Sequence, residues 1–262
     1  GDIHALEYEE LAIEHEAMPF EDYNKIRLFH FLIYVFNMDV FSAFHRGLRS
    51  HGLDFGTLAK CVAGDKDNWS NNWGNILDGF MKASQQELIS KEDTKILFDE
   101  ADLKTVSKME LALNPLFMAK LMSKKENIQD FYNYIWDALG RFFKHDLRSE
   151  SLSDLRESWR VSMDLFVCYE DLGEGFNREY DYDLDAWEAE KTPLPLREFK
   201  LDFPKKYNFH MLDEIRDVFE TSLSNTSNVE ETLYIMRMHI LANSERMHSW
   251  IRKADFPAEA AE

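Results

Sequence analysis

The sequence predicts a mainly α protein, a multi-helix bundle around one buried central helix with a small antiparallel β insert. The first observation is the stretch from Lys25 to Arg49, which is apolar on nearly every side of a helical wheel. The second is a succession of amphipathic segments, several opened by a capping residue. The third is a change in the apolar period, from about 3.6 residues to about 2, close to residue 176.

The central segment predicts a helix that other elements must surround. We expect its inward face to consist of Ile26, Phe29, Ile33, Phe36, Val40 and Phe44. A membrane span is excluded, because charged and polar residues interrupt any window of the ~20 residues that a bilayer crossing needs. The segment is therefore predicted to be a core helix.

Further helices follow from local periodicity and capping signals. Asp54 opens a short helix that ends at Gly64, Ser90 with Asp93 resembles a capping box, and Ser151 with Asp154 resembles another. Asn114-Pro115 interrupts the helical pattern. The predicted helices cover residues 54–64, 69–89, 125–145, 151–172, 212–223 and 229–253, although the start of the last range also fits a strand.

Strand alternation begins where the helical period stops. Phe176, Tyr180, Tyr182 and Leu184 occupy even positions with acidic residues between them. The alternation resumes at 199–203, and residues 207–209 suggest a third short strand. The predicted organisation is 1–18 as a linker or strand from an upstream domain, 19–172 as the helical bundle, 173–211 as a β-hairpin insert, 212–254 as C-terminal helices packing on the bundle, and 255–262 as a frayed tail.

Composition limits the class of partner. The formal net charge of −19 opposes binding to nucleic acid or to an anionic membrane. Two cysteines, Cys61 and Cys168, are far apart in apolar contexts, so we expect a reducing, cytoplasmic location. The N-terminus has no secretory signal, and Gly1 suggests an expression scar on a piece of a longer protein.

Two sets of residues are weak candidates for binding a substrate. The polar stripe Arg27, His30, Tyr34 and Asn37 lies on the central helix, where it either lines a polar cavity or forms the wet edge of that helix. The second set is Trp69 and Trp73, one turn apart, which could stack on a planar ligand but are more often core residues at this spacing.

No metal site and no catalytic residue is predicted. Glu245 and His248 have the spacing of half a di-metal site, but no second Glu-x-x-His accompanies them. Asp181, Asp183 and Asp185 resemble the start of a calcium loop without its glycine or closing glutamate. We interpret them as an acidic strand face, neutralised by a nearby cation such as Arg178 or Arg197.

Three segments together resemble the C-terminal region of cobalamin-binding radical SAM proteins, the Fe–S oxidoreductase-like family. They are YEELAIEHEAMPFEDYNKIRLFHFLIYVFN at 8–37, SQQELISKED at 84–93 and EYDYDLDAWEAEKTPLPLREF at 179–199. The resemblance implies an upstream barrel with S-adenosylmethionine and a [4Fe-4S] cluster, preceded by a cobalamin-binding region. This chain has no Cys-x-x-x-Cys-x-x-Cys, so no cluster ligand is assigned to any residue here.

The resemblance implies a non-catalytic accessory domain on the substrate side of a radical SAM, cobalamin-dependent enzyme, with no cofactor of its own. Its partners would be the upstream domains of the same polypeptide, and the chemistry would belong to their cofactors. The alternative is a free-standing helical protein that binds a ligand or a partner helix beside the central helix. Neither hypothesis gives a substrate or an oligomeric state.

Overall fold

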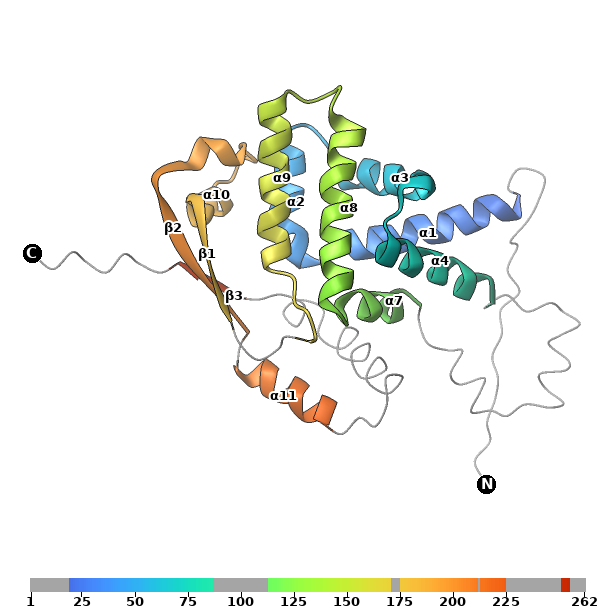
Figure 1. The fold of residues 1–262 in the computed structure, drawn as a ribbon. Helices are drawn as coiled ribbons and strands as arrows, with labels where there is room; N and C mark the ends of the chain where they lie inside the picture. The colour runs from blue at the N-terminus through green and yellow to red at the C-terminus, as the bar shows by residue number, and fades with distance from the viewer. Residues whose placement is uncertain (1–18, 87–112, 171–174, 212, 225–250, 255–262) are drawn as a thin grey trace, which may run out of the picture.

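A computed structural model describes residues 19–86, 113–170, 175–211, 213–224 and 251–254 (Figure 1). Within these residues the predicted fold class is confirmed, because the chain is mostly helical with one small antiparallel sheet. The helices are α1 (Phe20–Phe36), α2 (Ser42–Ser50), α3 (Phe55–Gly64), α4 (Asn71–Gln86), α7 (Leu113–Met122), α8 (Lys125–Phe143), α9 (Ser149–Asp164), α10 (Leu184–Ala189) and α11 (Asp213–Ser224). The strands are β1 (Phe176–Tyr182), β2 (Lys200–His210) and β3 (Ile251–Ala254), and short 3-10 turns cover Asp39–Phe41, Lys66–Asn68 and Leu196–Phe199.

The long N-terminal helix predicted from Lys25 to Arg49 is wrong, because the chain turns sharply after α1. Asn37 ends α1 through its backbone N–H, which donates to Ile33 O, and Met38 is extended (φ −71°, ψ 143°). The segment that follows, Asp39–Ser50, is bent by 73° from α1. Among the described residues no single helix is long and apolar enough to cross a membrane. Helix α1 and the segment Asp39–Ser50 reach that length and hydrophobicity only when taken together, and they are bent relative to each other.

The inward face of α1 also differs from the prediction. Ile26 is 43% exposed, and Phe29 and Ile33 are only partly buried. The buried side consists of Leu28, Phe31, Leu32, Val35 and Phe36. The periodicity of a helix that is apolar on almost every side does not identify its inner face. Which face of α1 is buried is determined by the helices that pack against it, α3, α4 and α7.

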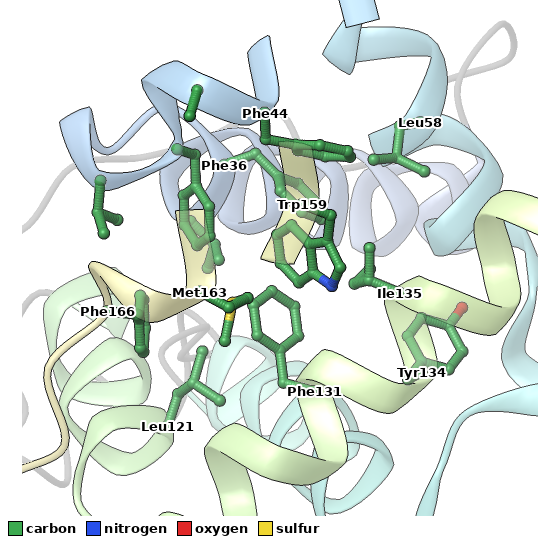
Figure 2. Close-up of a cluster of buried hydrophobic side chains, with 14 of the residues drawn as sticks. Phe36, Phe44, Leu58, Leu121, Phe131, Tyr134, Ile135, Trp159, Met163 and Phe166 are labelled. Atoms are coloured by element: carbon green, nitrogen blue, oxygen red, sulfur yellow. The ribbon is translucent and has the colours of Figure 1, made fainter. Parts of the chain in front are cut away.

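Phe131 of α8 lies at the centre of the core (Figure 2). Its ring centroid is 4.6 Å from Trp73 of α4, 5.4 Å from Trp159 of α9 and 6.1 Å from Phe36 of α1. Phe41, in the turn between α1 and α2, stacks on Trp159 at 5.5 Å. Aromatic side chains bury large areas and prefer offset or edge-to-face contacts, so this cluster joins four helices through one residue.

Helix ends agree in part with the predicted caps. The prediction for Asp54 is confirmed, because its carboxylate accepts a hydrogen bond from Thr57 N at the start of α3. The box predicted for Ser151 and Asp154 is wrong, since α9 begins at Ser149 and its Asp154 faces other elements. α9 also ends at Asp164, eight residues before the predicted end at Leu172. The predicted box at residues 90–93 lies outside the described residues.

The sheet has the order β1-β2-β3 with antiparallel pairing. Its β1–β2 register pairs Phe176 with Phe209 and shifts between Tyr180 and Tyr182, where β2 bulges. Two predictions are corrected here. Residues 184–189 form α10 instead of continuing the strand, and the expected second and third strands are the single strand β2. In addition, β3 replaces the last turn of the helix predicted to end at Lys253.

Candidate functional site

The four residues of the polar stripe predicted on α1 differ in their exposure to solvent. His30 and Asn37 are exposed, whereas Arg27 and Tyr34 are half-buried. Arg27 Nε donates to Ser84 Oγ of α4 at 2.9 Å, and burial raises the pKa of Tyr34. The stripe therefore provides one wet edge and one interhelical contact, and its role in binding a substrate stays a prediction.

The two tryptophans have different environments. Trp73 is fully buried, with its ring stacked 6.5 Å from Phe31. Trp69 is half-buried and follows the 3-10 turn Lys66–Asn68. Its Nε1 donates to Val62 O of α3 at 2.9 Å, and the Lys66 ammonium lies 5.7 Å from the centroid of its ring. The buried Trp73 ring packs against Phe31 and Phe131, so the pair does not present two parallel faces to a ligand.

The acidic run of residues 181–185 also has a structural explanation. Asp183 caps α10 by accepting from Ala186 N, and Lys205 Nζ lies 3.0 Å from Asp183 Oδ1 and 2.9 Å from Asp185 Oδ2. The expected neutralising cation is therefore Lys205, not Arg178 or Arg197. Within the described ranges no three His, Cys, Asp or Glu side chains are grouped to hold a metal ion, and the predicted Glu245–His248 pair lies outside those ranges.

A polar seam that sequence reasoning missed runs between α2 and α9. Asp154, Ser158 and Ser162 lie four residues apart on one face of α9 and are 4%, 0% and 0% exposed. Ser162 Oγ accepts a hydrogen bond from Phe44 N at 2.9 Å. Ser158 lies against Gly47, where even a β-carbon would be only 2.0 Å from its Oγ. The seam brings the two helices close enough for the backbone of α2 to contact serine side chains of α9.

Asp154 ends this seam and joins three parts of the chain. Its Oδ2 lies 2.9 Å from Nε2 of His51, at the end of α2. The same carboxylate accepts from Leu196 N at 3.1 Å and from Arg197 N at 2.7 Å, both in the turn that precedes β2. A carboxylate this deeply buried needs such partners, because an unpaired buried charge is costly.

A second carboxylate ties the sheet to α9. Asp164 accepts a hydrogen bond from the hydroxyl of Tyr180, and its Oδ1 lies 3.0 Å from Arg178 Nη2, both on β1. Arg160 lies 4.5 Å from the centroid of the Tyr180 ring. Burial, together with the neighbouring Asp164 charge, raises the pKa of Tyr180 well above its usual range. The hydroxyl is therefore held protonated as a hydrogen-bond donor.

Comparison with known proteins adds no assignment to this geometry. No protein-family model matches the chain, no curated protein matches it, and no solved structure matches it. The sequence signal for the missed seam was the i, i+4, i+8 repeat of Asp154, Ser158 and Ser162 within an otherwise amphipathic helix. Such a repeat of small polar residues on one face is typical of close helix packing, but its partner helix is not encoded locally.

Proposed function

We propose that this chain is a non-catalytic accessory domain, a helical module that contributes shape and a docking surface to a larger enzyme. The observation that supports this most directly is the use of its enclosed carboxylates. Four of them, the buried Asp154 and the half-buried Asp65, Asp130 and Asp164, already have structural partners on other elements. Asp65 bonds to Tyr134 and Arg141, Asp130 to Asn72 N and Trp73 N, Asp154 to His51, Leu196 N and Arg197 N, and Asp164 to Tyr180 and Arg178. Groups that hold helices together in this way are poorly placed to exchange protons with a substrate.

For the parent enzyme we propose the cobalamin-dependent radical SAM class, on the three resembling segments. This chain's own residues do not fit the cluster of that class, which needs three closely spaced thiolates. Cys61 and Cys168 are 107 positions apart (168 − 61), and burial near Asp65 raises the pKa of the Cys61 thiol. S-adenosylmethionine, the [4Fe-4S] cluster and cobalamin would therefore be bound by upstream domains, with this domain on the substrate side.

The test is whether the gene encodes further residues before Gly1. We expect the upstream reading frame to encode a barrel with a Cys-x-x-x-Cys-x-x-Cys motif. The full-length protein, purified without oxygen, should then contain iron, and removal of residues 19–254 should leave the iron content unchanged while abolishing substrate binding. A reading frame that starts at this N-terminus, with no cysteine triad before it, would end the proposal.

A free-standing binding protein is the second candidate, favoured by the open side of α1. Ile26 is exposed there, next to the partly buried Phe29 and Ile33. Such a surface suits an apolar ligand or the apolar face of a partner helix. In this case Ile26→Glu would weaken partner binding by the isolated chain without changing its stability, whereas the accessory-domain proposal predicts an effect only in the full-length enzyme.

A further inference from the structure

Residues 190–197, here called the strap, cross the surface of α2 and α9 with their backbone held at every second residue. Arg46 Nη2 of α2 donates to Glu190 O at 2.6 Å and to Thr192 O at 2.8 Å. Trp187 Nε1 donates to Leu194 O at 2.9 Å. At the far end the Asp154 carboxylate accepts the N–H groups of residues 196 and 197.

The composition of the strap explains why its backbone groups are available for these contacts. Pro193 and Pro195 have no N–H, and Pro195 has φ −55° and ψ 141°, close to polyproline II geometry. The two prolines remove N–H donors that could bond within the strap, although Leu194 N donates to Thr192 O at 2.8 Å and Leu196–Phe199 form a 3-10 turn. Recognition of such a segment by side-chain donors and an aromatic surface is a recurring mode of peptide binding.

One leucine side chain of the strap is buried in the protein and another is exposed to solvent. Leu196 is fully buried, whereas Leu194 is 38% exposed. The Arg46 guanidinium lies 5.6 Å from the Trp187 ring, and its buried Nε has no hydrogen-bond acceptor among the described residues. The surface that receives the strap therefore offers a hydrogen-bond donor that the present occupant leaves unused.

We propose that the surface formed by Arg46, Ser151 and Asp154 is a recognition site for proline-containing peptides, and that the strap is its resident internal ligand. The hydrogen bonds from this surface are made to backbone atoms of the strap, except that Ser151 Oγ accepts from Arg197 Nη1 at 3.3 Å. A partner segment with the pattern Pro-x-Pro-Leu-Arg would meet the same donors and acceptors when the strap is released. Covalent attachment gives the strap a high effective concentration, so it occupies the site by default.

Site-resolved hydrogen exchange on the intact protein is the first test. In the wild type we expect the amides of Leu196 and Arg197 to exchange faster than that of Val161 in α9, because the strap opens locally while the bundle stays folded. Arg46→Gln should accelerate the two strap amides about tenfold, the factor expected for losing one or two hydrogen bonds. Arg49→Gln, an exposed change one turn along α2, is the matched control and should have no effect.

The second test supplies the ligand in trans. A labelled peptide with the sequence of residues 188–198 should bind saturably to the Pro193→Gly/Pro195→Gly protein, in which the strap is more costly to order, and more weakly to the wild type. A peptide with both prolines replaced by glycine should bind more weakly, and adding Arg46→Gln to the protein should abolish binding.

Two results would overturn the proposal. One is exchange of the Leu196 and Arg197 amides at the rate of Val161 in the wild type and in both arginine variants, which would make the strap an inseparable part of the bundle. The other is equal uptake of the peptide by the wild type and the double-glycine variant. The hydrogen-exchange measurement does not need the double-glycine variant, so it still tests the proposal if that variant fails to fold.

Discussion

Gly47 of α2 and Ser158 of α9 pack without space for a single additional methyl group. A β-carbon on Gly47 would lie 2.0 Å from Ser158 Oγ and 2.6 Å from its Cβ. Real β-carbons essentially never approach a heavy atom this closely, so the two helices would have to separate. The position therefore requires glycine for reasons of space.

Gly47→Ala is expected to destabilise the protein by about 1–3 kcal/mol, the usual cost of overpacking a well-packed interior. Denaturant unfolding measures the change. Gly64→Ala is the control, because a β-carbon there meets nothing within 4 Å. That variant should be neutral or slightly stabilising. If both alanine variants unfold alike, the close approach of α2 and α9 is incorrect.

Asp130→Ala should loosen the start of α4 although the residue belongs to α8. Asp130 Oδ2 accepts from both Asn72 N and Trp73 N at 2.8 Å, so it caps α4 from another helix. Loss of a cap costs about 1–2 kcal/mol, and we expect the first amides of α4 to exchange faster in addition. Asp137→Ala, two turns further along α8 and exposed, should change neither quantity.

His45 should make stability depend on pH in the acidic range. The ring is half-buried, stacks on Phe55 at 4.6 Å and leaves Nε2 without a hydrogen-bond partner among the described residues. Burial lowers the pKa of His45 below 6.5, and Arg49 adds to the effect, against an opposing hydrogen bond to the Phe36 backbone. The unfolded chain then binds more protons than the folded chain at acidic pH, so the unfolding free energy falls as the pH drops below about 6.5.

His45→Gln should remove that part of the pH dependence. Urea midpoints at pH values about one unit above and one unit below the ordinary histidine pKa measure it, and the wild type should lose more stability between them than the variant. His145→Gln, at an exposed position, serves as the control and should retain the wild-type difference. Identical pH profiles for the wild type and His45→Gln would contradict the buried, neutral imidazole.

At alkaline pH the protein should unfold over the same pH range in which its buried tyrosines ionise. Burial raises the pKa of seven described tyrosines: Tyr34, Tyr132, Tyr134, Tyr169, Tyr180, Tyr182 and Tyr207. Above the ordinary tyrosine pKa of about 10 the folded state keeps protons that the unfolded state loses, so stability falls as the pH rises. Tyrosinate absorbance should increase together with the loss of helical circular dichroism. A large increase with the helical signal intact would show that these hydroxyls are open to solvent.

Features that depend on neighbouring residues could be predicted from the sequence. Asp54 capping Thr57 N and the helix at Lys125–Phe143 follow from local propensity and periodicity, and both are found in the structure. The change of period near Phe176 correctly located β1. These predictions succeed because a cap and an apolar period are both written in residues close together in the sequence.

Features that depend on distant partners could not be predicted. The sequence predicts Asp154 as part of a local capping box, but its partners are His51 and the backbone of residues 196 and 197, which are 103, 42 and 43 positions away along the chain. Lys205 pairs with Asp183, 22 positions away, because the antiparallel pairing of β1 and β2 places Lys205 opposite Tyr180. Likewise, the choice of inner face on α1 is made by the helices that pack on it, and its own sequence is nearly symmetric in hydrophobicity.

The short pairing between β2 and β3 bears on how these molecules associate when concentrated. Only residues 207–210 of β2 pair with β3, so the stretch before them has no strand on that side among the described elements. Pro204 removes a donor from that rim, and Lys200 and Lys206 place charge along it. Pairing of this rim with a strand from a second molecule is thereby disfavoured, even though Phe203 on the same strand is 83% exposed.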